Sequence, residues 1–77
     1  MWVIITRDQC NFCDDAKALL KGSGMHYVEY NVQSDSSRWI AHLMKKAGLT
    51  TVPQIFYPDG VHLGGYTDLK EHIVKGW

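Results

Sequence analysis

Two cysteines that lie two residues apart, Cys10 and Cys13, limit what this chain can fold into more than any other feature, and they are its only cysteines. They follow a short apolar run, Trp2 to Thr6, which predicts a buried strand. They precede residues 14–20, which predict a helix. A strand-to-helix junction places the first sulfur at a helix N-terminus, where free N–H groups and the helix dipole favour an anion. A thiolate in such a place attacks disulfides, so the pattern predicts a reactive dithiol.

Length and charge limit the classes of protein to which this chain can belong. The chain has 77 residues, and we expect residues 1–77 to form a single small domain. Eight Lys and Arg residues balance eight Asp and Glu residues, which argues against a broad surface for nucleic acid or anionic membranes. No apolar run approaches the roughly 20 residues that span a bilayer. Residues 1–6 lack a basic leader, so we expect no signal peptide and a reducing, cytoplasmic environment for the dithiol.

Periodicity and turn signals predict the element order β-α-β-α-β-β-α. The predicted strands are residues 2–6, 27–32, 54–57 and 61–63. The first predicted helix is residues 11–21. The second is capped by Ser34 or Asp35 and ends at Gly48, and the third is capped by Thr67 or Asp68. A parallel β-α-β unit followed by an antiparallel hairpin gives a mixed four-stranded sheet with helices on both faces. This is an α/β, thioredoxin-like architecture.

Apolar spacing predicts which helix faces are buried. The second helix carries its large apolar side chains at helical spacing, and we expect them in the core; they are Trp39, Ile40, Leu43 and Met44, followed by Ala47. On the last helix, Leu69 and Ile73 form the expected buried face.

The two cysteines could instead form half of a zinc site, which needs two further ligands. The available histidines are His26, His42, His62 and His72, none at close paired spacing. We therefore expect no metal, and we place these histidines on the surface or the hairpin.

Three landmarks in this order resemble the glutaredoxin family, and in particular its compact dithiol members in bacteria and phages. They are the dithiol Cys10-Asn11-Phe12-Cys13, the tripeptide Thr51-Val52-Pro53 and the segment Gly64-Gly65-Tyr66-Thr67-Asp68. The resemblance covers nearly the whole chain and is especially close over residues 50–56.

The resemblance implies roles for particular residues. Cys10 would be the nucleophile, and Cys13 would resolve the mixed disulfide. The Val52–Pro53 bond would be cis, with the Val52 backbone pairing with the cysteinyl part of glutathione. The positions that match the family's glutathione site are Arg7, Phe12, Thr51, Val52, Pro53, Gly65, Tyr66, Thr67 and Asp68.

Within this implied site, the N-terminus of the last helix would take the γ-glutamyl carboxylate, and Asp68 would take the ammonium. Gly65 would let the ligand approach closely. Arg7 would pair with the thiolate or with the glycyl carboxylate. Phe12 and Tyr66 would form an exposed rim near the dithiol.

The sequence also departs from the family pattern. Asn11-Phe12 replaces the common Pro-Tyr pair, and Asp14 and Asp15 replace basic residues after the second cysteine. These acids stabilise a helix start but oppose a nearby thiolate. No basic residue precedes the Thr-Val-Pro segment, and Arg38 would substitute for a polar contact that the second helix lacks.

The predicted function is therefore a glutathione-dependent thiol–disulfide oxidoreductase that reduces protein disulfides and glutathione mixed disulfides. Glutathione would be a co-substrate, with no tightly bound cofactor. The resemblance implies a monomer in the cytoplasm, or in the host cytoplasm if a phage encodes it, with ribonucleotide reductase as one client. A thioredoxin-like donor reduced by a flavoprotein reductase is the first alternative. A dimer holding an iron–sulfur cluster through Cys10 and glutathione ranks lower, because Cys13 competes by forming a disulfide.

Overall fold

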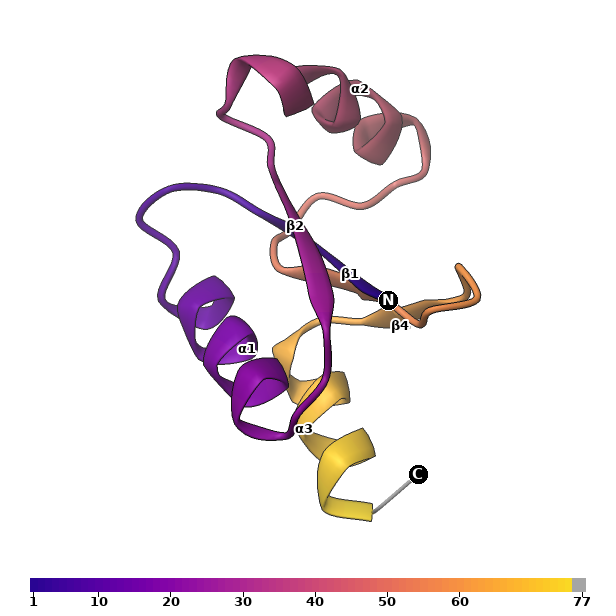
Figure 1. The fold of residues 1–77 in the computed structure, drawn as a ribbon. Coiled ribbons are helices and arrows are strands. Elements are labelled where there is room, and N and C mark those ends of the chain that lie inside the picture. Colours follow the sequence, from indigo (N-terminus) through magenta and orange to yellow (C-terminus); the bar gives the residue numbers. More distant parts are fainter. Residues whose placement is uncertain (76–77) are drawn as a thin grey trace.

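The computed structural model describes residues 1–75, so the domain predicted over residues 1–77 includes two residues outside the described part. The predicted element order is confirmed, with one additional 3-10 turn before the second helix (Figure 1). The elements are β1 (Trp2–Thr6), α1 (Asn11–Gly22), β2 (Tyr27–Asn31), η1 (Asp35–Ser37), α2 (Arg38–Lys46), β3 (Gln54–Phe56), β4 (His62–Gly64) and α3 (Tyr66–Lys75).

The sheet is mixed and has four strands in the order β2-β1-β3-β4. β1 runs parallel to β2, from the pair Trp2 and Tyr27 to the pair Thr6 and Asn31. β3 is antiparallel to both β1 and β4. The predicted thioredoxin-like fold is therefore confirmed, and β1 at its centre leads directly into the segment that carries the cysteines.

Alternate side chains of β1 point to opposite sides of the sheet. Both sides are covered by helices, so β1 is buried on both faces. On one face, α1 and α3 cover a core cluster that consists of Trp2, Ile4, Ala16, Leu20, Ile55 and Leu69. On the other face, Ile5 packs against Ile40 and Met44 of α2. Figure 1 shows α1 and α3 together on one side of the sheet and α2 on the other.

The predicted core face of α2 is only partly right. Ile40 and Met44 are buried, but Trp39 is 58% exposed and Leu43 is 54% exposed. Each pair forms its own i, i+4 stripe, and the two stripes lie about 100° apart around the helix. This short helix buries only one of them.

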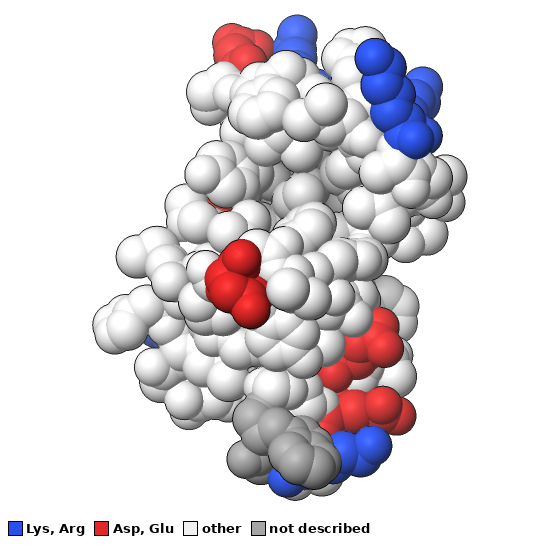
Figure 2. All heavy atoms as spheres, turned by 90° about the vertical axis from the view of Figure 1, so that its right-hand side faces the viewer, with Lys and Arg blue, Asp and Glu red and all other residues white. Residues whose placement is uncertain are grey.

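The exposed stripe of α2 forms one wall of an open apolar groove of about 560 Å³. Val3, Tyr30 and Phe56 line the opposite, sheet side of the groove. Figure 2 shows the molecule hollowed below α2, with side chains of both charges above the hollow and below it. The indole N–H of Trp39 donates to the Ser36 carbonyl oxygen at 3.0 Å, which holds the ring outside the core.

The helix starts also differ from the predicted caps. Ser34 precedes η1 and Ser37 precedes α2, and neither side chain makes a capping hydrogen bond. α3 begins at Tyr66, because the Leu69 N–H already donates to the Gly65 carbonyl at 3.1 Å. Gly65 is therefore the N-cap, and Asp68 is the third helical residue. Its carboxylate accepts the Gly65 N–H at 3.0 Å, as the acidic member of a capping box does.

One histidine is not on the surface or the hairpin. His72 is half-buried, with its ring centroid 5.5 Å from Trp2 and 5.3 Å from Tyr57. It lies on the side of α3 that packs against the start of β1. No helix within residues 1–75 combines the length and the apolar character that crossing a membrane requires.

Candidate active site

The dithiol lies at the N-terminus of α1. Cys10 and Cys13 form a disulfide, with their Cα atoms 5.2 Å apart. Cys10 is the N-cap of α1 in extended conformation, and its Sγ accepts the Cys13 N–H at 3.2 Å. Sulfur thus takes the place of the usual capping oxygen. In the dithiol state the same N–H can donate to a Cys10 thiolate, which the helix dipole also favours.

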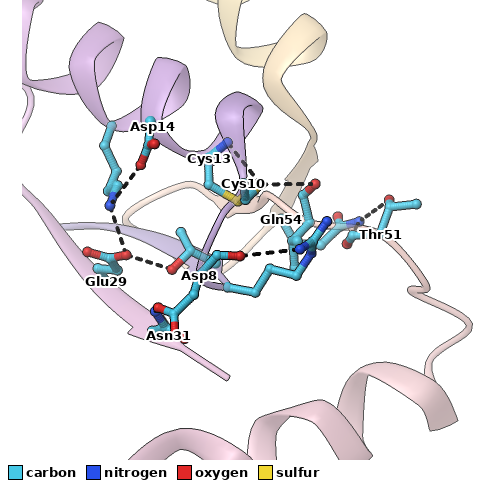
Figure 3. Close-up of a disulfide and its surroundings, with 12 residues drawn as sticks. Asp8, Cys10, Cys13, Asp14, Glu29, Asn31, Thr51 and Gln54 are labelled. Carbon is cyan, nitrogen blue, oxygen red and sulfur yellow. Dashed lines mark hydrogen bonds and ion pairs between the residues drawn. A yellow bond between two sulfur atoms is a disulfide. The ribbon is translucent and has the colours of Figure 1, made fainter. Parts of the chain in front are cut away.

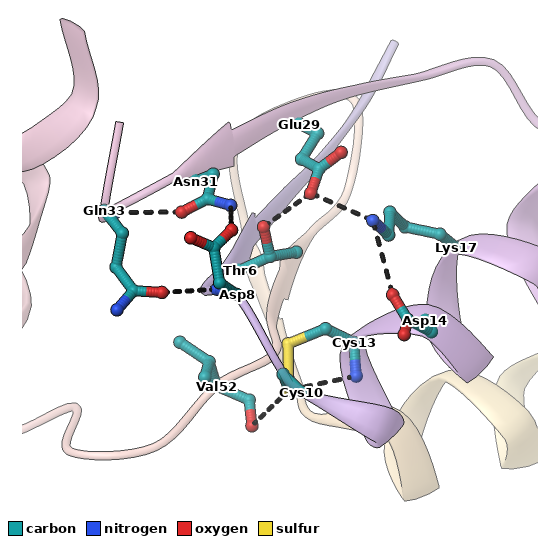
Figure 4. Close-up of polar contacts among 10 residues, drawn as sticks. All are labelled: Thr6, Asp8, Cys10, Cys13, Asp14, Lys17, Glu29, Asn31, Gln33 and Val52. Carbon is teal, nitrogen blue, oxygen red and sulfur yellow. Dashed lines mark hydrogen bonds and ion pairs between the residues drawn. A yellow bond between two sulfur atoms is a disulfide. The ribbon is translucent and has the colours of Figure 1, made fainter. Parts of the chain in front are cut away.

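The two cysteine residues differ in exposure. Cys10 is 7% exposed, whereas Cys13 is 1% exposed and belongs to the buried face of α1. The Val52 carbonyl oxygen lies 4.0 Å from the Cys10 Sγ (Figure 4). Cys10 is therefore the more exposed of the two cysteines, and it lies next to the loop that carries Val52.

The loop from β1 to Cys10 is held against the end of β2 by a polar network that the sequence analysis missed. The Asp8 carboxylate accepts from the Asn31 side chain at 2.8 Å, and the Asp8 N–H donates to the Gln33 side chain (Figure 4). Gln9 adopts a positive φ of 52° to complete the turn. The available signal was the parallel pairing of the first two strands, which brings their carboxyl ends together.

A second network ties α1 to β2 beside the disulfide. The buried Thr6 hydroxyl donates to Glu29 at 2.6 Å, and the Lys17 ammonium lies 3.1 Å from the same oxygen (Figure 4). The hydrogen bond to Glu29 raises the pKa of Lys17 above its ordinary value of 10.5. Lys17 also lies 3.6 Å from Asp14, so one of the two acids that follow the dithiol is partly neutralised.

The Val52–Pro53 peptide bond is cis, as predicted. The loop that contains it forms one wall of a pocket of about 190 Å³, and Gly65 and α3 form another. The residues that line the pocket are Phe12, Thr51, Val52, Pro53, Gly65, Tyr66 and Thr67, and all seven are among the positions predicted for glutathione. The structure thus brings together side chains from three separate parts of the chain.

The other two predicted positions lie outside this lining. Arg7 is exposed, and its guanidinium donates to the Asp8 carbonyl at 3.2 Å rather than to the sulfur. Asp68 uses one carboxylate oxygen for the Gly65 N–H. Position 64, rather than position 65, is the one that requires glycine. The φ of Gly64 is +135°, and a Cβ there would collide with the Asp68 carboxylate.

The two aromatic residues of the predicted rim are in contact but are not equally exposed. Phe12 is 61% exposed, and its ring centroid lies 5.8 Å from that of Tyr66. Tyr66 is half-buried and packs against the core cluster under α1 and α3, so the expectation of two exposed rings is wrong for Tyr66. Across residues 1–75, no cluster of three or more His, Cys, Asp or Glu side chains could hold a metal ion.

Comparison with known proteins identifies the family. The Glutaredoxin family model matches residues 2–63. This chain belongs to the glutaredoxin family. Glutaredoxin 3 of Escherichia coli is 39% identical over 73 residues, which cover 95% of this chain and 86% of that protein. The glutaredoxin of Enterobacteria phage T4 is 34% identical over 74 residues and covers 84% of this chain and 85% of its own length.

Solved structures agree with this assignment. A buckwheat glutaredoxin in complex with glutathione matches with a TM-score of 0.81 and 28% identity, over 97% of this chain and 69% of that one. Glutaredoxin 1 of Francisella tularensis matches with a TM-score of 0.76 and 29% identity, over 96% of this chain and 92% of that one. Glutaredoxins are thiol–disulfide oxidoreductases, and the Cys10–Cys13 pair gives this chain the redox-active dithiol of that activity.

Proposed function

We propose that this protein uses glutathione as its co-substrate and reduces both protein disulfides and glutathione mixed disulfides. The observation that carries the proposal is the pocket beside the dithiol, whose lining consists of the cis-proline loop, Phe12 and the start of α3. The glutathione complex of the buckwheat protein, a structural relative of this chain, supports the same assignment.

Cys10 is the nucleophile in this proposal. Its thiolate attacks one sulfur of the substrate disulfide, a mixed disulfide forms on Cys10, and the other substrate sulfur leaves as a thiolate that takes up a proton. The Cys13 thiolate then attacks the Cys10 sulfur, which releases the second substrate thiol and closes the Cys10–Cys13 disulfide. The buried position of Cys13, 1% exposed, suits a group that reacts only within the protein.

Two glutathione molecules restore the dithiol. The first attacks Cys10, forms a mixed disulfide and releases Cys13 as a thiolate. The second attacks the sulfur of the bound glutathione, which yields glutathione disulfide and the Cys10 thiolate. For a glutathione mixed disulfide as substrate, the attack of Cys10 gives this glutathionylated form directly, so Cys13 is not needed.

The pocket can hold glutathione through backbone groups. The N–H groups in the first turn of α3 lack helical acceptors and suit the γ-glutamyl carboxylate. The Asp68 oxygen that does not accept from Gly65 is available for the ammonium. The Val52 backbone pairs with the cysteinyl part next to Cys10. Protein clients, for which the family resemblance suggests ribonucleotide reductase, would approach over the exposed Phe12 ring.

The test is turnover of a glutathione mixed disulfide with glutathione as the sole reductant. We expect wild type to be active, Cys10→Ser to be inactive and Cys13→Ser to retain activity. An inactive wild type that a flavoprotein reductase nevertheless reduces would contradict the proposal and favour a thioredoxin-like donor.

A further inference from the structure

Gln54 is a buried polar side chain directly after the cis-proline loop, and the mechanism above does not use it. It is 7% exposed. Its amide nitrogen donates to the Thr51 carbonyl oxygen at 2.9 Å and lies 3.3 Å from the Thr51 hydroxyl (Figure 3). These two bonds close the loop on itself from Thr51 to Gln54, around Val52 and Pro53. A buried amide makes such bonds at fixed geometry because leaving them unmade is costly.

The other end of the Gln54 amide is held from the neighbouring strand. Its carbonyl oxygen lies 2.6 Å from the His62 Nε2, and the His62 ring lies on Phe56 with 4.9 Å between centroids. The Thr51 carbonyl can only accept, so the Gln54 nitrogen must face it and the Gln54 oxygen must face His62. His62 therefore donates from Nε2. A relay of hydrogen bonds runs from His62 on β4 through Gln54 on β3 to the loop.

Few other side-chain hydrogen bonds hold this loop. Within the part of the chain that the structure describes, side-chain hydrogen bonds reach Thr51 only from Gln54. The Val52 side chain packs on the cluster of Ile5, Ile40 and Met44. The one side-chain hydrogen-bonding contact to its backbone in the described residues is the 4.0 Å approach of the Cys10 sulfur to its carbonyl, and that sulfur changes partners during the reaction. A loop whose backbone must pair with an extended ligand needs an anchor that does not depend on the redox state.

We propose that Gln54 is a positioning residue that fixes the backbone of Thr51 and Val52 for ligand pairing beside Cys10, and that His62 orients Gln54. This inference rests on the proposed glutathione function, because glutathione is the ligand that the loop is positioned for. The role lies in binding, so its loss should affect KM more than kcat.

The first test uses two substitutions at Gln54 that preserve its size. Gln54→Met removes all three hydrogen bonds of this side chain, and Gln54→Glu replaces the donor that faces Thr51 with an acceptor at pH 7. We expect both variants to raise KM for a glutathione mixed disulfide about tenfold, with kcat within about threefold of wild type. Reduction of the Cys10–Cys13 disulfide by dithiothreitol, which needs no pocket, should stay within about twofold.

Histidine variants supply the matched comparison. His62→Ala keeps the bonds from Gln54 to Thr51, removes the outer hydrogen bond of the relay together with the ring contact on Phe56, and should raise KM about threefold. His26→Ala replaces another exposed histidine, whose side chain makes no hydrogen bond in the described structure, and should leave KM unchanged. An unchanged KM in a folded Gln54→Met protein, or equal effects of the two histidine variants, would overturn the positioning role while leaving the glutathione function intact.

A second readout does not depend on glutathione. Backbone order parameters from NMR relaxation of the free protein should be lower at Thr51 and Val52 in Gln54→Met than in wild type, and unchanged in α1. If wild type fails to turn over glutathione substrates, the proposed function is wrong, and this readout decides alone. Lower order parameters at Thr51 and Val52 then support the anchoring of the loop by Gln54, and unchanged order parameters overturn it.

Discussion

The Cys10 sulfur caps α1, and in the proposed mechanism the same atom is the nucleophile. The Cys13 N–H lies 3.2 Å from that sulfur and is a fixed donor to it. Charges in the first turns of α1 act on the same atom. Asp14 is partly neutralised by Lys17 at 3.6 Å, whereas Asp15 is exposed and makes no ion pair within the described residues. Asp15 is therefore the better position at which to change the field around the thiolate.

Reversing the charge of Asp15 should make the dithiol more reactive. A charge near a helix N-terminus contributes about 0.3–1 kcal/mol at the surface, which corresponds to a factor of about two to five. We expect Asp15→Lys to raise the rate of alkylation of the reduced protein by iodoacetamide at pH 7 by this factor, with the effect shrinking at high salt. Asp35→Lys makes the same charge change in η1, away from the dithiol, and is the control. Equal rates in the two variants would contradict the argument.

At the scale of elements, α1 is joined to β2 by the ion pair of Lys17 and Glu29, whose side chains are 27% and 31% exposed. Glu29→Gln keeps an acceptor for the Thr6 hydroxyl and removes only the charge. We expect it to lower the free energy of unfolding at pH 7 by about 0.5–1 kcal/mol. Urea unfolding measures the loss. Lys21→Met, an exposed change in the last turn of the same helix, should lower the free energy of unfolding by less than Glu29→Gln does.

The pH dependence of this pair follows from the raised pKa of Lys17. A raised pKa in the folded state means that the stabilisation is complete below the ordinary lysine pKa of 10.5 and is lost as pH rises through the higher folded-state value. The difference in stability between wild type and Glu29→Gln should therefore be constant at neutral pH and shrink above pH 10.5. A difference that grew with pH would assign the stabilisation to another group.

The two stripes of α2 should differ sharply in their response to substitution. Met44 is 8% exposed, and truncation to alanine should cost about 2–3 kcal/mol. Leu43 is 54% exposed, and Leu43→Gln should change the free energy of unfolding by less than about 0.5 kcal/mol. Urea unfolding of both variants tests the burial directly. A large loss for Leu43→Gln would mean that the groove beside α2 is closed in solution.

Local chemistry made much of this molecule predictable from sequence, and tertiary contacts explain the rest. The dithiol, the cis-proline loop and the start of α3 each carry their signal within a few adjacent residues. Periodicity could not choose between the Trp39 and Ile40 stripes, because the choice depends on where the sheet lies. The position of Gln54 in a hydrogen-bonded relay could not be predicted from sequence, because its partner His62 lies on the neighbouring strand and becomes adjacent only when the hairpin forms.

At the scale of the whole molecule, the two faces of the sheet are unequally packed. The face under α1 and α3 holds six buried residues in its core cluster, whereas the face under α2 holds three. The apolar groove of about 560 Å³ lies on the weaker face. Stability in a small domain scales with buried apolar surface, so α2 is the part that can open at the lowest free energy.

Native-state hydrogen exchange should detect this difference. We expect the amides of α2 to exchange through local opening at a free energy at least about 1 kcal/mol below that of β1, whose amides should open only on global unfolding. The opening of α2 should show little dependence on low concentrations of urea, because it exposes little surface. Equal free energies and equal urea dependence in α2 and β1 would contradict the argument. Since Leu49 and Val52 pack on the α2 cluster, an opening of α2 would also loosen the loop beside Cys10. The Leu49 N–H donates to the Met44 carbonyl at 2.8 Å, so the Leu49 amide should then exchange together with α2.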